Sequence, residues 1–280
     1  MKNIPDLNPA ALIKQYGLHA DKRLGQNFLC DRFELECIAA AAEIEDTDSV
    51  LEIGPGVGSL TRYLAGYAHE VVAVELDEKF DCILQIILKP YDNVRVVYGD
   101  ILELSPNQLG LPPNYIVAAN IPYNITSAII RHLLESDSKP RRIVLTIQKE
   151  VAQRLCEEPP KMSLLALSVQ VYGKPTIIRL IPAAAFYPAP QVDSAVVRIE
   201  IHPEPIINAP YLPVFFRLIK AGFSQKRKTL RNALSAGLAT STEEVEALLD
   251  QTKIDPQRRA ETLSLEEWGS LTESSINLKT

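Results

Sequence analysis

Short β-branched runs alternate with longer helical patterns between about residues 50 and 150, and this alternation constrains the fold most. Strands that alternate with helices of this length are typical of βαβ units, which place parallel strands in one open sheet. The expected strands are Val50–Ile53, Val71–Leu76, Val94–Tyr98, Tyr115–Ala119 and Ile143–Ile147. The expected helices are Ser59–Ala68, Asp77–Leu88, Thr126–Glu135 and Lys149–Leu155. The sequence therefore predicts an α/β fold with a parallel sheet.

The pattern changes toward the C-terminus. Leu164–Val171 predicts one more helix, and Val192–Ile201 predicts a long strand at the far edge of the sheet. After His202, several prolines indicate a linker, and the helical periods that follow contain no strand signal. Ser241 precedes a threonine and two glutamates, which is typical of a helix start.

We therefore expect two domains. The first covers residues 1–204, with residues 1–20 as an N-terminal extension, and the second is a small all-helical domain at 205–280.

Composition narrows the class of protein. Hydrophobic residues make up 46% of the 280 residues, without an apolar run long enough to span a bilayer or a recognisable secretory signal. The four cysteines are scattered, so we expect reduced thiols, no metal site and a cytoplasmic location. The net charge of −6 argues mildly against a nucleic-acid partner, although phosphate binding depends on where the cations cluster.

A glycine-rich loop follows the first expected strand, in the sequence EIGPGVGSLT at 52–61. Gly54 and Gly56 would allow close backbone approach by a ligand. Glu75 ends the second strand, where its carboxylate could accept hydrogen bonds from both hydroxyls of a ribose. Asp100 and Ile101 follow the third strand at the same rim. The alternative is that the glycines only shape a turn, and the two strand-end acids make it less favourable.

Two nucleoside cofactors compete for such a pocket. A dinucleotide fingerprint requires glycine at the sixth position of the loop, which is Ser59 here. Glu52 stands just before the loop and would repel a diphosphate, whereas it suits a sulfonium and an ammonium. The comparison favours S-adenosylmethionine.

Asn120, Ile121, Pro122 and Tyr123 follow the fourth expected strand. An adenine N6 amine is a poor nucleophile, because its lone pair is delocalised into the ring. Asn120 and the backbone carbonyl of Ile121 could accept its two hydrogens, and Pro122 lacks a competing N–H. Tyr123 offers a flat face for an extruded base. These residues also suit a plain turn, but their position at the ligand rim favours an amine-directed site.

Phe186 opens the proline-rich segment FYPAPQVDSA at 186–195. We expect its ring to form a second stacking face opposite Tyr123. The alternative is a core aromatic at the entrance of a strand.

The sequence resembles the ribosomal RNA adenine dimethyltransferase family. The resemblance covers about residues 20 to 200 and is carried by LGQNFL at 24–29, EIGPGVGSLT, VELD at 74–77, GDIL at 99–102, NIPYNIT at 120–126 and FYPAPQVDSAVV at 186–197. It implies a Rossmann-like domain that uses S-adenosylmethionine to make N6,N6-dimethyladenosine. It also implies that Asn27 and Leu29 line the cofactor site, that Glu75 binds the ribose and that Asp100 binds the adenine amine.

Two branches of that family share these motifs. The C-terminal segments AGFSQKRKTLRNAL at 221–234 and DPQRRAETLS at 255–264, with the VDSAVV segment, resemble the housekeeping branch. That branch dimethylates two adjacent adenosines near the 3′ end of small-subunit (16S) ribosomal RNA. Ile121 is more typical of the macrolide-resistance branch, which acts on large-subunit (23S) RNA. A catalytically silent RNA-binding assembly factor is a third possibility, and it predicts damaged motifs.

Two groups of cations are candidates for phosphate binding. Lys226, Arg227, Lys228 and Arg231 have no acidic residue among their immediate neighbours in the sequence, and a second pair is Lys22 and Arg23. The alternative is a solvated helix face. We expect a monomer, without a membrane partner, that binds small-subunit RNA inside a pre-ribosomal particle.

Overall fold

The computed structural model describes residues 4–277, except for the side chains of Lys22 and Asn277. The chain folds into two compact units. Unit 1 contains Met1–Ala152 and Thr176–Ile201, and unit 2 contains Gln153–Pro175 and His202–Thr280. The segment Gln153–Pro175 thus groups with the C-terminal helices.

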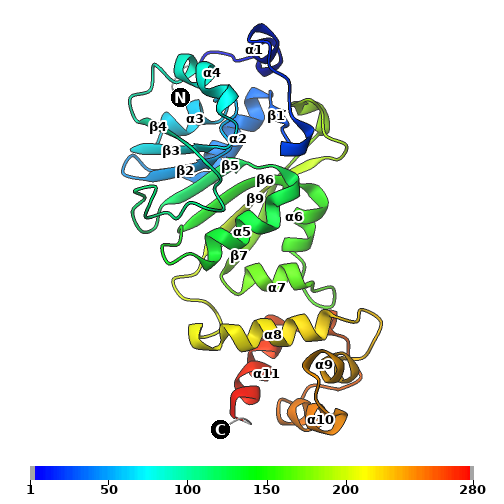
Figure 1. The fold of residues 1–280 in the computed structure, drawn as a ribbon. Helices are drawn as coiled ribbons and strands as arrows, with labels where there is room; N and C mark the ends of the chain where they lie inside the picture. Colours follow the sequence, from blue (N-terminus) through cyan, green and yellow to red (C-terminus); the bar gives the residue numbers. More distant parts are fainter. Residues whose placement is uncertain (1–3, 278–280) are drawn as a thin grey trace. The chain divides into compact units, whose positions relative to one another are not determined.

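Unit 1 is built on a sheet with the strand order β4-β3-β2-β5-β6-β9-β7 (Figure 1). Five neighbouring strands are parallel, namely β2 (Ser49–Ile53), β3 (Glu70–Glu75), β4 (Val94–Tyr98), β5 (Ile116–Asn120) and β6 (Arg142–Gln148). The predicted α/β class with a mostly parallel sheet is confirmed. The chain runs outward from β2 to β4 and then returns to β5, so the strand order reverses between β2 and β5. Ligands of such sheets bind at the carboxyl ends of the strands near this reversal.

The far edge of the sheet differs from the prediction. β9 (Ser194–Ile201) runs antiparallel to β6 and lies inside the sheet, so the expectation of an edge strand there is wrong. The edge is β7 (Gly173–Ile181), for which the sequence analysis assigned no element. Pro175 weakens the strand pattern in the sequence, because proline cannot donate to the hydrogen-bond ladder of a sheet. Proline is therefore confined to edge strands and strand ends.

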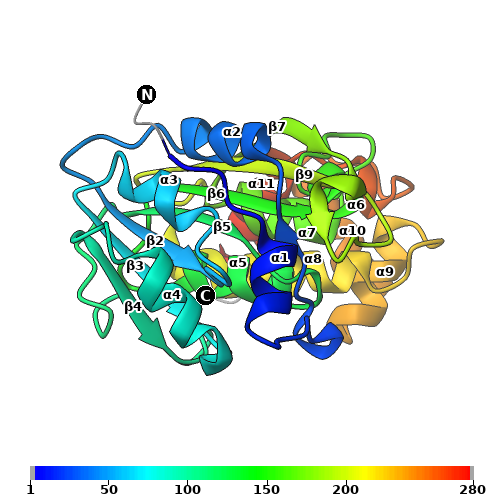
Figure 2. The ribbon, with the colours of Figure 1, turned by 90° about the horizontal axis from the view of Figure 1, so that it is seen from above.

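Helices cover both faces of the sheet (Figure 2). α2 (Arg32–Ala42) and α3 (Thr61–Ala65) lie on one face, and α4 (Asp81–Ile87) and α5 (Thr126–Glu135) lie on the other. α2 and α3 bury a cluster against alternate strand residues that includes Ile38, Leu64, Val71, Ile116 and Val144. α1 (Pro9–Gln15) adds Ile13 to a second cluster with Phe28, Val57, Phe80, Ile83 and Leu84.

Short elements connect the ends of these strands. β1 (Phe28–Leu29) pairs antiparallel with β8 (Phe186–Tyr187) in a separate two-stranded sheet. This pairing brings the LGQNFL motif beside the proline-rich segment, although more than 150 residues separate them. Single helical turns lie at Lys22–Leu24, Glu78–Phe80, Tyr123–Ile125 and Ala183–Ala185, and α6 (Lys149–Leu155) follows β6.

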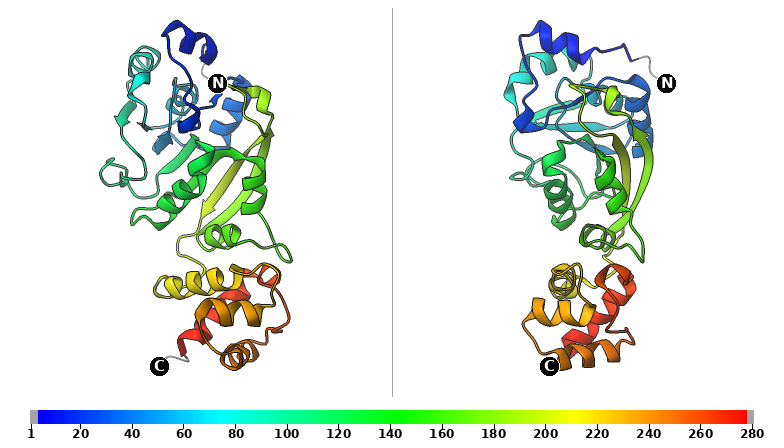
Figure 3. Two further views of the ribbon diagram at one scale, coloured as in Figure 1. Left: turned by 45° about the vertical axis from the view of Figure 1, so that its right-hand side comes forward. Right: turned by 90° about the vertical axis from the view of Figure 1, so that its right-hand side faces the viewer.

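Unit 2 is helical in its C-terminal part. Its helices are α7 (Leu164–Gln170), α8 (Leu212–Phe223), α9 (Leu230–Leu238), α10 (Thr242–Gln251) and α11 (Leu265–Asn277), and α8 to α11 gather around a common core (Figure 3). Trp268 of α11 is fully buried there. The predicted helix start at Ser241 is confirmed, because Ser241 and Glu244 form a reciprocal capping box. Among helices of the described residues, none combines the length and apolar character that crossing a bilayer requires.

Candidate active site

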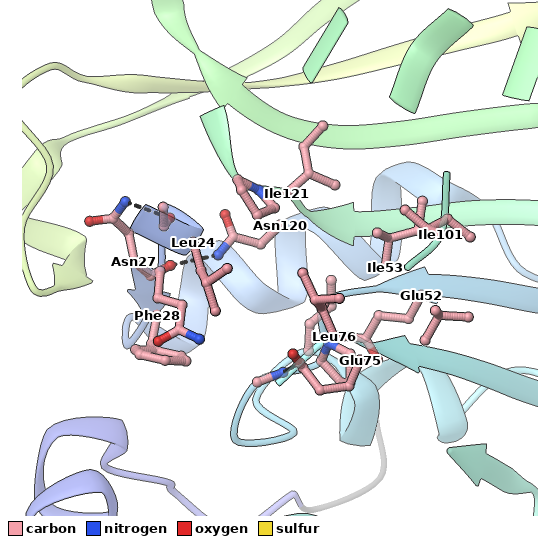
Figure 4. Close-up of a pocket in the computed structure, with 18 of the residues that line it drawn as sticks. Leu24, Asn27, Phe28, Glu52, Ile53, Glu75, Leu76, Ile101, Asn120 and Ile121 are labelled. Atoms are coloured by element: carbon pink, nitrogen blue, oxygen red, sulfur yellow. Dashed lines mark hydrogen bonds between the residues drawn. The ribbon is translucent and has the colours of Figure 1, made fainter. Parts of the chain in front are cut away.

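A cavity opens at the carboxyl ends of the parallel strands, beside the reversal between β2 and β5 (Figure 4). Each strand end contributes one polar feature to it: the glycine loop after β2, a carboxylate at β3, another after β4, and an amide at β5. The residues singled out from the sequence that line this cavity are Asn27, Leu29, Glu52, Gly54, Gly56, Ser59, Glu75, Asp100, Ile101, Asn120, Ile121, Pro122 and Tyr123.

The glycine loop presents open backbone to the cavity. Gly54 has a φ of +70°, and a Cβ built on it would meet no atom within 4 Å. Its backbone conformation excludes most side chains, and the space beside it is free for a ligand. Glu75 accepts a hydrogen bond from the backbone N–H of Gly56 at 2.9 Å and another from Asp77 at 2.9 Å. These bonds fix the carboxylate while each oxygen keeps a second lone pair.

Glu52 lies beneath the loop and is only 1% exposed. Its Oε2 atom has no hydrogen-bond partner among the described residues. Burial raises the pKa of Glu52 to about 8, so the carboxyl group is mostly protonated at neutral pH. Burial also raises the pKa of Glu75. Two buried acids beside one cavity form an environment that favours a cation over a diphosphate.

Apolar side chains complete the cavity beyond the residues that the sequence analysis named. Leu76 lines it next to Glu75 and is 52% exposed, much as the predicted residue Ile101 lines it next to Asp100. Phe80 also lines it and packs edge-on against Phe28, with ring centroids 5.4 Å apart. In the sequence, Glu75 and Asp100 are each followed directly by an aliphatic residue. This pattern could have predicted an apolar slot with a polar rim.

Asn120 is oriented by the loop that contains Asn27. Its Nδ2 atom donates to the backbone carbonyl of Asn27 at 2.9 Å, and Figure 4 shows the amide nitrogen turned toward that residue. Because a carbonyl only accepts, the nitrogen must face Asn27, and the Oδ1 atom is left as an acceptor. Asn27 is itself held by a bond from its Nδ2 to the carbonyl of Gly25 at 3.1 Å.

Tyr123 and Phe186 lie in different environments. Tyr123 lines the cavity, and its hydroxyl group shares a 2.5 Å hydrogen bond with Oγ of Ser194. Burial raises the pKa of the Tyr123 phenol. Phe186 is 4% exposed and packs into the core cluster with Leu29 and Leu35. Its ring does not line the cavity, so the structure places it as the core aromatic weighed above, and not opposite Tyr123.

The predicted cations also differ from one another. Arg23 is highly exposed and pairs with Asp21 at 2.8 Å, while the side chain of Lys22 lies outside the described structure. In unit 2, Lys226, Arg227 and Lys228 are exposed and form no ion pair with a described residue.

Arg231 is engaged within unit 2. Its Nη1 atom lies 2.6 Å from Oε1 of Glu246, which belongs to α10. Arg231 has no acidic residue among its immediate neighbours in the sequence. This partner lies 15 residues away along the chain, so local sequence did not reveal it.

Comparison with known families agrees with this geometry. A family model described as ribosomal RNA adenine dimethylase matches residues 17–277. The chain belongs to the ribosomal RNA adenine dimethylase family. It is therefore an enzyme of the methyltransferase class whose substrate is adenine in ribosomal RNA, as the sequence analysis predicted.

Relatives of this dimethylase cover most of the chain. A protein of Dehalococcoides mccartyi named ribosomal RNA small subunit methyltransferase A is 46% identical over 93% of this chain and 90% of its own length. A protein of the same name from Alkaliphilus metalliredigens is 40% identical over 94% of each chain.

Solved structures agree on the fold. The 23S rRNA methyltransferase ErmE matches with a TM-score of 0.73 at 28% identity, over 88% of this chain and 98% of its own. A dimethyladenosine transferase from Plasmodium falciparum matches with a TM-score of 0.76 at 24% identity, over 90% and 98%. The predicted Rossmann-like methyltransferase fold is confirmed.

Proposed function

We propose that this dimethylase transfers methyl groups from S-adenosylmethionine to N6 of two adjacent adenosines near the 3′ end of small-subunit ribosomal RNA. The product is N6,N6-dimethyladenosine, and the substrate is a pre-ribosomal particle bound by a monomeric enzyme. The observation that carries the proposal is the orientation of Asn120, whose amide nitrogen is occupied by Asn27 while its oxygen remains an acceptor.

The rim residues fit the proposed cofactor. Glu75 retains lone pairs for both ribose hydroxyls, and Asp100 keeps one oxygen beyond its 2.9 Å bond from the N–H of Leu102. Leu76 and Ile101 offer apolar surface to an adenine ring. When bound, S-adenosylmethionine supplies an electrophilic methyl group on a sulfonium. Glu52 suits that positive charge, because a nearby cation favours the ionised form of a buried carboxyl.

Asn120 and Ile121 prepare the amine. The Oδ1 atom of Asn120 accepts one N6 hydrogen, and the backbone carbonyl of Ile121 accepts the other. Together they favour a pyramidal nitrogen whose lone pair is available for attack. Pro122 leaves no N–H to compete for these acceptors. These hydrogen bonds accelerate methyl transfer by orienting the amine, so a strong general base is not required.

Tyr123 provides the stacking face for the extruded adenine. Its ring lines the cavity that also contains Asn120. We leave Phe186 out of the base site, because its ring packs in the core.

Exposed cations of unit 2 bind RNA phosphates in this proposal. Lys226, Arg227 and Lys228 supply the unpaired charges, and Arg259 joins them as an exposed residue. The backbone N–H of Leu230 donates to the carbonyl of Arg258 at 2.6 Å, which holds the two segments together. We propose only a minor role for Arg231, because Glu246 neutralises it.

The small subunit is the favoured substrate because the relatives with the highest identities cited above are named small subunit methyltransferases. The test is tritium transfer from labelled S-adenosylmethionine to purified small and large subunits, followed by nucleoside analysis. We expect label in small-subunit RNA as dimethyladenosine. Label confined to large-subunit RNA would support the resistance branch, and RNA binding without transfer would support a silent assembly factor.

A further inference from the structure

Ser194 is the first residue of β9, and its hydroxyl group faces the candidate site. The residue is completely buried, and its Oγ atom lies 2.5 Å from the hydroxyl oxygen of Tyr123. In the sequence, the VDSAVV segment marks only a family branch, and Ser194 has no role in the proposed reaction. A buried hydroxyl group in contact with the residue proposed to stack the base calls for an explanation.

The position of Ser194 is fixed on both sides. In the sheet, Ser194 pairs with Gln148 at the end of β6. The preceding residue, Asp193, accepts a hydrogen bond from the backbone N–H of Lys149 at 3.0 Å through its carbonyl. Its side chain accepts another from the N–H of Ala183 at 3.1 Å. The backbone that carries the serine hydroxyl is therefore held at the end of the sheet.

Tyr123 lies on a different element. It begins a single helical turn, Tyr123–Ile125, that directly follows the strand-end residue Asn120 and its two neighbours. A tyrosine ring rotates about two side-chain torsions, and one bond at the hydroxyl end restricts both. Tyr123 also borders a second cavity, together with Asn27, Asn124 and Gln148.

We propose that Ser194 is a positioning residue, which holds the ring of Tyr123 in the plane that an adenine must adopt to present N6 to Asn120. This inference rests on the proposed function. Ser194 acts through Tyr123 and does not touch the reacting atoms. Through Tyr123, Ser194 connects the proline-rich segment, of which it is a part, to the stacking of the base.

A double-mutant cycle tests this role, because Tyr123→Phe keeps the ring and removes the hydroxyl. We expect Ser194→Ala to lower kcat about tenfold, the size of one well-placed hydrogen bond, with unchanged cofactor affinity. In the Tyr123→Phe background, Ser194→Ala should cause no further loss. A second tenfold loss in that background would overturn the proposal, since it would show that Ser194 acts independently of the phenol.

A matched control separates this effect from the loss of any buried hydroxyl. Thr146 is equally buried, lies on the neighbouring strand β6, and has no hydrogen-bond partner for Oγ1 among the described residues. Thr146→Val should keep kcat within about twofold. A loss in this control equal to that of Ser194→Ala would assign both effects to the sheet and would contradict the proposal.

A spectroscopic readout keeps the inference testable apart from the methyl transfer. In protein labelled with 3-fluorotyrosine, the ¹⁹F resonance of Tyr123 is assigned by its absence in Tyr123→Phe. Ser194→Ala should shift and narrow this resonance, because the ring gains freedom, while Thr146→Val should leave it unchanged. An unchanged resonance in Ser194→Ala would overturn the positioning role. Absence of transfer to small-subunit RNA in the wild type would instead contradict the proposed function.

Discussion

At the scale of single residues, the account depends most on the oxygen of Asn120. Asn120→Ala removes the acceptor that we propose for the reacting amine, so we expect kcat to fall by about 10²- to 10³-fold with cofactor affinity retained. Asn120→Asp should lose activity comparably, because its carboxylate would repel the Asn27 carbonyl that orients the native amide. Asn107→Ala, at an exposed asparagine, is the control. Dimethyladenosine formation by the alanine variant at the wild-type rate would show that the assigned role is wrong.

The buried carboxyl of Glu52 predicts a pH effect on stability. Its pKa is about 8 in the folded chain against an ordinary value of 4.5. Between these values the folded state holds a proton that the unfolded state has released, so wild-type stability falls as pH rises. Relative to wild type, Glu52→Gln should gain stability from pH 5 to pH 8, on the order of 3 kcal/mol.

Urea unfolding at several pH values measures this difference, and Glu103→Gln, at an exposed position, is the control. A stability difference between Glu52→Gln and wild type that stays constant across the pH range would contradict the assigned pKa.

At the scale of elements, the loop before β1 must fit closely against the reaction centre. Gly25 has a φ of +65°, and a Cβ there would lie 2.9 Å from Oδ1 of Asn124 and 3.1 Å from Cβ of Pro122. Gly17 has the same φ but no atom within 4 Å of such a Cβ. Both Gly→Ala variants should lose about 1 kcal/mol of stability from backbone strain. Only Gly25→Ala should also lose cofactor affinity and transfer, measured by calorimetry and by methylation assay.

The elements also show what sequence patterning can predict. Each expected parallel strand coincides with an observed one within about a residue at either end, as β4 at Val94–Tyr98 illustrates, because buried β-branched runs leave few alternatives. The polar residues at the rim of the cavity could be predicted as well, because they lie at the ends of those strands. β7 was missed because Pro175 and an alternating, half-exposed pattern weaken its signal.

Contacts between distant segments could not be predicted in this way. The pairing of β1 with β8 buries Phe186, and Glu246 reaches Arg231 from another helix. The bond between Tyr123 and Ser194 joins residues 71 positions apart. None of these pairs has a periodic or local signature in the sequence, because each is a tertiary contact between segments that only folding brings together.

At the scale of the whole molecule, the proposed function requires this acidic chain to bind RNA phosphates through local groups of cations. Replacing Lys226, Arg227 and Lys228 by alanine should weaken RNA binding and reduce the slope of log K against log salt by up to about one unit for each phosphate that the variant no longer neutralises. Lys89→Ala, at an exposed lysine of unit 1, should leave the slope unchanged. Filter binding at several salt concentrations measures both. An unchanged slope in the triple variant would show that the RNA phosphates bind elsewhere on the protein.

The identity of the modified nucleosides tests both the proposed reaction and its substrate. Small-subunit particles that lack the modification are incubated with the enzyme and S-adenosylmethionine, and their RNA is digested and analysed by mass spectrometry. The account predicts two N6,N6-dimethyladenosines per RNA strand, in adjacent positions near the 3′ end. Dimethyladenosine found only in large-subunit RNA, or methyl groups found on another nucleoside, would contradict it.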